Sequence, residues 1–319
     1  MSRPTVVIPD DYPAVMGPSV AYQSLTSRAD VKYHENLPPS TDVLLDRIRD
    51  AQYVINIRSS IDFTADVLSS CPNLKVLSLW GTGTDHVDLS AASRLGIDVT
   101  NTPAVSAKAM AEHALALMLS VARDIPRIDA KTKKGAWPRG FVTQLHGKTL
   151  GVIGLGAIGL QTARIARGIG MNVIAWTMNP ANKPLDEIGI RLVDLDELYR
   201  ESDVVSVHLR QSAETLGFIG KAQFDLMKST AILVNTARGP IVNEAALVDA
   251  LRAKSIGGAG LDVYDTEPLP ENHPLSAFPN VVMTPHSGGV TTEALEAGLQ
   301  LAIENVFWAI EGKVPNRVA

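Results

Sequence analysis

Residues 148–159 read Lys-Thr-Leu-Gly-Val-Ile-Gly-Leu-Gly-Ala-Ile-Gly, and the fold of the surrounding domain follows from this stretch. The largely apolar run at 150–153 is typical of a buried parallel strand. Gly154, Gly156 and Gly159 follow with the spacing G-x-G-x-x-G. The first glycine permits a tight turn, the second lets backbone approach a pyrophosphate, and the third lets a helix lie close to the strand.

A helix is predicted to begin at once after this turn. Ile158, Thr162, Ile165, Ala166 and Ile169 share one face at a period of 3.6 residues. The free N–H groups and the dipole at the helix N-terminus form an anion site suited to phosphates. A second strand at 172–176 completes a strand–helix–strand unit, which predicts dinucleotide binding. The alternative is a glycine-rich turn that binds nothing.

Composition limits the other classes of function. A chain of 319 residues with 45% hydrophobic residues suggests about two globular domains. The net charge of −5 without a long basic run argues against nucleic acid or an anionic membrane as a partner. The single cysteine, Cys71, allows no intrachain disulfide, and no signal peptide or membrane span is expected. We therefore expect a cytoplasmic protein, and we expect no bound metal.

The first 99 residues alternate strand and helix signals, which predicts a second parallel α/β domain without a phosphate fingerprint. Its expected strands are 6–9, 53–57 and 76–79, and its expected helices are 42–51 and 65–70. The turn Gly81-Thr-Gly-Thr-Asp-His-Val-Asp88 follows the last of these strands. Its backbone N–H groups could hold a carboxylate, or it could be a plain turn leading to a helix capped by Asp88.

The middle of the chain predicts a buried helix and an exposed arm. Residues 109–122 are apolar nearly all round, which indicates a helix buried between domains or subunits. We expect paired or capping roles for Glu112 and His113 within it. Residues 131–141 are interrupted by glycine and proline and predict an exposed arm, with Trp137 as a candidate interface anchor.

Polar residues follow three successive strands of the dinucleotide domain. Arg238 follows the strand expected at 231–236, Glu267 follows that at 258–263, and His286 follows that at 281–284. Arginine can hold a carboxylate in two hydrogen bonds, histidine can pass a hydroxyl proton, and glutamate can hold the other histidine nitrogen. Together these side chains suit a 2-hydroxy or 2-keto acid, although singly each is often a structural ion pair or cap.

The chain resembles the D-isomer-specific 2-hydroxyacid dehydrogenases, a family that includes phosphoglycerate dehydrogenase and glyoxylate/hydroxypyruvate reductase. The resemblance runs over nearly the whole length. The motifs that carry it are Gly81–Asp88, Ala111-Glu-His113, Gly151–Gly159, Asn235-Thr-Ala-Arg-Gly239, Asp262-Val, Glu267-Pro and Thr284-Pro-His286. It implies two Rossmann-like α/β domains with doubly wound parallel sheets. The outer, substrate-binding domain is discontinuous, 1–100 with 288–319, and the dinucleotide-binding domain is 101–287.

The resemblance also implies roles for residues. Arg238, Glu267 and His286 become the catalytic set, and the backbone of Thr82 and Gly83 joins Arg238 in binding substrate. The residues implied at the cofactor, NAD(H) or NADP(H), are Gly154, Gly156, Ala157, Ile158, Gly159, Thr177, Arg210, Thr236, Ala237 and Asp262. The implied partners are a small 2-hydroxy or 2-keto acid and a second copy of the chain in a homodimer.

One departure from the family pattern concerns the cofactor. NAD-specific members carry Asp where this chain has Thr177, and Arg210 stands where proline is common. A neutral threonine does not repel a 2′-phosphate, and Arg210 could pair with it, so NADP(H) is one expectation. The other is that Thr177 hydrogen-bonds an NAD ribose and Arg210 is simply solvated.

These observations predict an NAD(P)-dependent oxidoreductase that interconverts a small D-2-hydroxy acid and its 2-keto acid. Hydride transfer is the chemistry of the cofactor, and the protein supplies placement and charge. The alternative is a non-catalytic, dinucleotide-sensing scaffold like the corepressors related to this family. A C-terminal regulatory domain is not expected, because the chain ends soon after its last predicted helix, at 291–311.

Overall fold

The computed structural model describes residues 3–57, 60–180 and 185–319. They form two compact units: unit 1 comprises 1–106 with 291–319, and unit 2 comprises 107–290. The chain therefore passes between the units at 106 and again at 290, whereas we expected these crossings at 100 and 287. Hydrogen bonds explain the difference, because Asn101 N donates to Asn316 O within unit 1 and Gly288 N donates to Asp262 within unit 2.

Unit 1 is a doubly wound parallel sheet with the strand order β2-β1-β3-β4-β5. The strands are β1 (Thr5–Ile8), β2 (Asp30–Tyr33), β3 (Tyr53–Asn56), β4 (Val76–Leu79) and β5 (Asp98–Thr100). The helices are α1 (Val20–Arg28), α2 (Thr41–Ile48), α3 (Ala65–Ser69), α4 (Leu89–Leu95) and α12 (Thr292–Ile310). Alternate strand residues face opposite cores: Val6 and Ile8 pack with α1 and α12, while Val7 packs with α2, α3 and α4.

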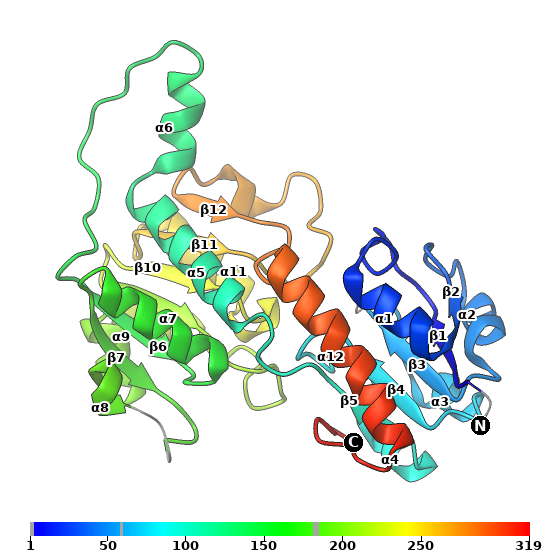
Figure 1. Cartoon of the computed structure of the whole chain (residues 1–319). Coiled ribbons are helices and arrows are strands. Elements are labelled where there is room, and N and C mark those ends of the chain that lie inside the picture. The colour runs from blue at the N-terminus through cyan, green and yellow to red at the C-terminus, as the bar shows by residue number, and fades with distance from the viewer. Residues whose placement is uncertain (1–2, 58–59, 181–184) are drawn as a thin grey trace. The chain divides into compact units, whose positions relative to one another are not determined.

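Unit 2 holds seven parallel strands in the order β12-β11-β10-β9-β6-β7-β8. They are β6 (Thr149–Ile153), β7 (Asn172–Trp176), β8 (Ile190–Leu192), β9 (Val204–Val207), β10 (Ile232–Asn235), β11 (Gly258–Leu261) and β12 (Val281–Met283). The helices are α5 (Ala107–Ala122), α6 (Ile125–Thr132), α7 (Ala157–Gly168), α8 (Leu185–Ile188), α9 (Leu195–Glu201), α10 (Lys221–Leu226) and α11 (Glu244–Arg252). Short 3-10 turns lie at Gly239–Ile241 and Pro274–Ala277. The two parallel sheets confirm the predicted fold class (Figure 1).

Helix α5 packs on the sheet of its own unit. Its Leu117 and Met118 join the core formed by α7 and strands β6, β7, β9 and β10. Gly260 of β11 permits this approach, since a Cβ there would lie 2.9 Å from Leu117 Cβ. One face of α5 is thus covered by its own sheet, which confirms a largely buried helix; its expected place between domains or subunits stays a prediction.

An extended arm follows α5. Helix α6 and the chain that returns from it stand away from the sheet of unit 2 (Figure 1), and no residue of α6 is buried. Trp137 is 73% exposed and Phe141 is fully exposed. The exposed arm predicted at 131–141 is therefore confirmed.

In the described part of the chain, we find no helix with the length and apolar character that a membrane crossing needs.

Candidate active site

The glycine turn after β6 is shaped for a phosphate group. Gly154 has a φ of +98°, and a Cβ there would lie 2.6 Å from the carbonyl oxygen of His208. A Cβ on Gly159 would collide with the Gly154 carbonyl, whereas nothing lies within 4 Å of the Cβ position of Gly156. No side chain caps the N-terminus of α7. Open space at the second glycine in front of an uncapped helix end fits the pyrophosphate of a dinucleotide.

Thr177 and Arg210 lie on the two sides of that turn. Thr177 directly follows β7, Arg210 comes after β9, and both strands pair with β6. Thr177 is half-buried, and Arg210 is exposed. The positions 177–179 read Thr-Met-Asn, so no carboxylate follows β7 directly.

The loop after β10 is held by an amide that we had not singled out from the sequence. Asn235 is 1% exposed, its Oδ1 accepts from Ala237 N at 3.0 Å, and its Nδ2 donates to Arg238 O at 2.9 Å. Gly239 fits against the Tyr264 carbonyl, where a Cβ would collide. The one feature of the sequence that could have indicated this role is the position of the Asn235 side chain at the end of a buried strand. Asn235 fixes the backbone from which the Arg238 side chain extends.

Thr236 lies in the same loop and is 4% exposed. Nothing among the described residues hydrogen-bonds its Oγ1. A buried hydroxyl without a protein partner costs free energy unless a ligand satisfies it. Thr236 therefore fits the expectation that a cofactor lies at this strand end.

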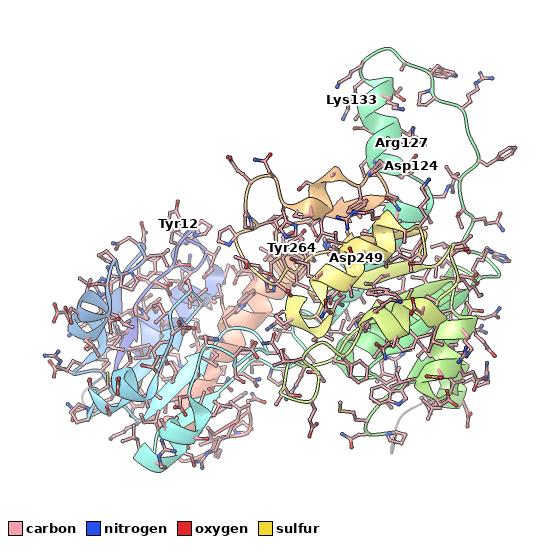
Figure 2. All side chains as sticks on the ribbon, turned by 180° about the vertical axis from the view of Figure 1, so that it is seen from behind. Tyr12, Asp124, Arg127, Lys133, Asp249 and Tyr264 are labelled. Carbon is pink, nitrogen blue, oxygen red and sulfur yellow. The ribbon has the colours of Figure 1, made fainter. Side chains whose placement is uncertain are left out.

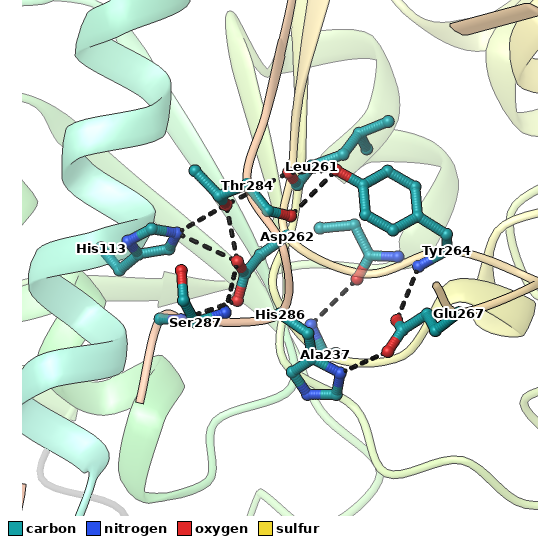
Figure 3. Close-up of polar contacts among 11 residues, drawn as sticks. His113, Ala237, Leu261, Asp262, Tyr264, Glu267, Thr284, His286 and Ser287 are labelled. Carbon is teal, nitrogen blue, oxygen red and sulfur yellow. Dashed lines mark hydrogen bonds and ion pairs between the residues drawn. The ribbon is translucent and has the colours of Figure 1, made fainter. Parts of the chain in front are cut away.

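Glu267 and His286 form a direct pair. His286 Nδ1 lies 2.7 Å from Glu267 Oε2, and Glu267 Oε1 accepts from Tyr264 N at 3.0 Å (Figure 3). Burial alone would raise the pKa of Glu267. The hydrogen bonds from His286 and Tyr264, and the charges of His286 and Arg238, outweigh burial and hold that pKa below its usual value. The carboxylate is therefore ionised at neutral pH.

The side chain of His286 is 43% exposed. Because Nδ1 is occupied by Glu267, Nε2 is the ring nitrogen available to a substrate, and no described residue hydrogen-bonds it. An imidazole with one nitrogen held by a carboxylate and the other open is suited to passing a proton.

The Asp262 carboxylate, expected at the cofactor, has no exposed surface. It accepts from Thr284 Oγ1 at 2.6 Å and from the N–H groups of Ser287 and Gly288 at 2.9 Å each, and His113 Nε2 lies 3.4 Å away (Figure 3). Burial would raise the pKa of Asp262, but these hydrogen bonds lower it to about 2. Protein donors thus surround the carboxylate, and the place at the cofactor expected for Asp262 stays a prediction. The paired role expected for His113 is confirmed.

Thr82 and Gly83 belong to unit 1 and follow β4. The loop is fixed by Gly81 N donating to Thr102 Oγ1 at 2.7 Å and by Asn101 Nδ2 donating to Thr82 O at 3.0 Å. Asp88 caps α4 by accepting from Ala91 N at 2.8 Å, as one of the two interpretations of this turn required. Among the described residues, none accepts a hydrogen bond from the backbone N–H groups of Thr82 and Gly83.

Residues 115–288 match the family described as "D-isomer specific 2-hydroxyacid dehydrogenase, NAD binding domain". The chain belongs to this family.

Curated relatives and solved structures agree with this assignment. A D-3-phosphoglycerate dehydrogenase of Archaeoglobus fulgidus is 43% identical over 83% of this chain and 51% of its own length. A glyoxylate reductase of Aeropyrum pernix is 41% identical over 87% of this chain and 85% of its own length. The structure of an acyclic imino acid reductase in complex with NADPH and D-Arg is 30% identical, covers 99% of this chain and 100% of its own, and superposes with a TM-score of 0.89. The chain thus spans about half the length of the phosphoglycerate dehydrogenase relative.

Membership makes the chain an oxidoreductase of the D-2-hydroxyacid dehydrogenase family, and the matched segment is the family's NAD-binding domain. Within residues 3–57, 60–180 and 185–319, no three His, Cys, Asp or Glu side chains gather as they would around a metal ion.

Proposed function

We propose that this dehydrogenase reduces a small 2-keto acid to the D-2-hydroxy acid, with Arg238, Glu267 and His286 as its catalytic residues. The observation that carries the proposal is the pairing of His286 Nδ1 with Glu267 Oε2 at 2.7 Å, which leaves Nε2 open. The loops that follow β10, β11 and β12 bring the three side chains to one edge of the unit 2 sheet, where ligands bind in such folds.

A nicotinamide cofactor held at the glycine turn would supply the hydride that is added at C2 of the keto acid. The Nε2–H of protonated His286 donates its proton to the carbonyl oxygen, which becomes the hydroxyl of the product. Arg238 binds the carboxylate and polarises the carbonyl. The substrate contact expected for the backbone of Thr82 and Gly83 stays a prediction. Glu267 orients the imidazole and stabilises its charged form before the proton leaves.

The substrate that we propose first is glyoxylate, supported by the relative that is named glyoxylate reductase. The test follows oxidation of NADPH and of NADH at 340 nm with glyoxylate, hydroxypyruvate, pyruvate and phenylpyruvate. Turnover with glyoxylate supports the proposal. Tight cofactor binding without turnover on any acid contradicts it and favours the dinucleotide-sensing scaffold.

We propose that the enzyme works in the cytoplasm, where reduced nicotinamide cofactors are available. The sequence has a single cysteine and so forms no intrachain disulfide, which suits a reducing compartment. Finding the protein in the secreted fraction of its natural cells would contradict this location.

The charge of Glu267 is expected to set the pH range of reduction. Glu267→Gln removes the carboxylate that stabilises the imidazolium, so less His286 carries a proton at a given pH. Reduction requires that proton, so activity falls at high pH. We expect the falling limb of the kcat/KM profile to move to lower pH by about one unit in the variant.

The matched control is Glu244→Gln, which breaks another Glu–His pair, that of Glu244 Oε1 with His273 Nε2 at 2.9 Å. This control should leave the falling limb of the kcat/KM profile at its wild-type pH. An unmoved limb in Glu267→Gln would refute the proposed role of the carboxylate.

We propose that the cofactor pocket accepts NADP(H), because the residue after β7 is the neutral Thr177 and Arg210 lies on the other side of β6. Thr177→Asp should lower kcat/KM for NADPH at least about tenfold relative to NADH, since a carboxylate repels the 2′-phosphate and binds ribose hydroxyls. Thr177→Asn has similar size without charge and should keep the NADPH activity. A wild-type enzyme that already strongly prefers NADH would count against this proposal.

We propose that the arm formed by α6 and the following chain to Val142 binds a second copy in a homodimer. Trp137, Phe141 and Val142 are exposed along it, and a depression of about 250 Å³ at its base is lined in part by Phe141 and Pro279. The arm is also basic, with Lys131, Lys133, Lys134 and Arg139, whereas the whole chain carries −5. Figure 2 shows Arg127 on α6 and Lys133 directly after its last residue. Apolar anchors within a basic segment complement an acidic copy of the same chain.

The arm predicts an effect on oligomeric state. The double variant with Trp137→Ala and Phe141→Ala should sediment as a monomer at micromolar concentration, where the wild type sediments as a dimer. Leu216→Ala, which truncates a 53% exposed leucine elsewhere in unit 2, is the control and should remain dimeric. A monomeric wild type would contradict the proposal.

A further inference from the structure

The turn that carries His286 is hydrogen-bonded to the buried carboxylate of Asp262. Asp262 accepts from the N–H groups of Ser287 and Gly288, the two residues after His286, at 2.9 Å each. His286 itself has a φ of +51°, a left-handed conformation that residues other than glycine adopt at a cost. Such a conformation persists where surrounding bonds fix it, and Asp262 supplies two of those bonds.

A histidine on α5 holds that carboxylate in turn. His113 Nε2 lies 2.9 Å from Thr284 Oγ1 and 3.4 Å from Asp262 Oδ1. The Thr284 hydroxyl donates its only proton to Asp262 Oδ1 at 2.6 Å, so it must accept from His113. This assigns the Nε2 proton to His113 and directs it toward Thr284 and Asp262.

The His113 ring also packs against the turn. A Cβ on Gly288 would lie 2.8 Å from His113 Cδ2, so the ring and the backbone of the turn are in close contact. The His113 imidazole therefore contacts both ends of the segment from Thr284 to Gly288. It hydrogen-bonds Thr284 (Figure 3) and packs against Gly288.

We propose that His113 is a positioning residue for the reaction: through Thr284 and Asp262 it fixes the turn that aims His286 at the substrate and at Glu267. The inference rests on the proposed role of His286. Without the His113 N–H, Asp262 and Thr284 lose a shared donor, the turn loosens, and the hydrogen bond of His286 to Glu267 is less often formed.

The experiment compares His113→Leu, which fills the space without donating, with His113→Gln, whose Nε2 can donate from a similar position. In the leucine variant we expect kcat to fall about tenfold to a hundredfold, because small misplacements of reacting groups have effects of this size. KM for cofactor should change less. The glutamine variant should recover most of the activity. Thermal unfolding and cofactor binding show whether each variant is folded.

A second readout needs no turnover. In enzyme labelled with ¹³C at histidine Cε1, the His286 signal is identified by its absence in His286→Gln, and its NMR titration is followed with pH. We expect the midpoint to move to lower pH in His113→Leu and to stay at the wild-type position in His113→Gln. This readout separates the inference from the proposed function, because it is informative even if no tested acid is a substrate.

Thr284→Val provides an independent variant that keeps the branched shape and removes the hydroxyl between His113 and Asp262. It should move the midpoint of the His286 titration in the same direction. The double variant with His113→Leu should show a midpoint close to that of either single variant, because both substitutions interrupt the same hydrogen bonds from His113 through Thr284 to Asp262. The inference is overturned if His113→Leu leaves kcat and the midpoint unchanged. It is also overturned if the leucine and glutamine variants are equally impaired, since packing alone would then explain the effect, or if the two single effects simply add.

Discussion

Replacing His286 with glutamine should lower kcat for keto-acid reduction by about two to four orders of magnitude, the range typical of a lost general acid. Glutamine retains hydrogen-bonding groups of similar reach but cannot carry a proton to the carbonyl oxygen. KM for cofactor should change little, because the phosphate turn at Gly154–Gly159 lies on other strands of unit 2. Steady-state kinetics on glyoxylate, with cofactor affinity measured by fluorescence, test both expectations.

His146→Gln is the matched control for this variant, since His146 is exposed and precedes the amino end of β6, whereas His286 follows the carboxyl end of β12. It should keep wild-type turnover. Turnover in His286→Gln within a factor of a few of wild type would remove His286 from the catalytic set and would leave the His286–Glu267 pair as a structural contact.

Replacing Arg238 with lysine should lower kcat/KM by about a hundredfold or more, even though the charge is kept. A guanidinium can form two parallel hydrogen bonds with a carboxylate, whereas an ammonium acts as a point charge. We expect a raised KM for the acid together with a lowered kcat, because Arg238 binds the carboxylate and also polarises the carbonyl. The backbone around it is fixed by Asn235, so the loop itself should persist.

Arg238→Ala allows a chemical test of the same point. Added guanidinium ion should restore part of the activity, and added ammonium ion at equal concentration should not. Arg252→Lys, at an exposed arginine that pairs with Asp249, is the control for the Arg-to-Lys change and should have no effect. Equal activity of Arg238→Lys and wild type would show that two-point binding of the carboxylate is not required.

Much of the architecture could be predicted from the sequence because buried parallel strands are short apolar runs. The expected strands at 76–79 and 281–284 correspond to β4 and β12. The strands that we did not predict, such as β2 and β8, lie at sheet edges and carry exposed polar residues such as Asp30 and Arg191. An edge strand needs no continuous apolar run, so its pattern does not stand out from a loop.

The polar network around the turn at His286 could not be predicted in this way. Asn235 and Asp262 follow or end buried strands, but nothing in the sequence tells which donors surround each side chain. Only the structure shows that the donors around the Asp262 carboxylate are Thr284 after β12, His113 of α5 and the backbone of the turn.

The sequence by itself determined the doubly wound α/β class, the glycine turn for a dinucleotide, and the presence of arginine, glutamate and histidine at three strand ends. Each of these depends on local spacing: the period of apolar residues, the G-x-G-x-x-G interval, and the place where a strand stops. Only the tertiary structure decided that His286 pairs with Glu267, 19 residues away, and that His113 reaches Thr284 across 171 residues. Hydrogen bonds are short and directional, so such partners are fixed only when packed strands and helices bring distant backbone segments within about 3 Å of one another.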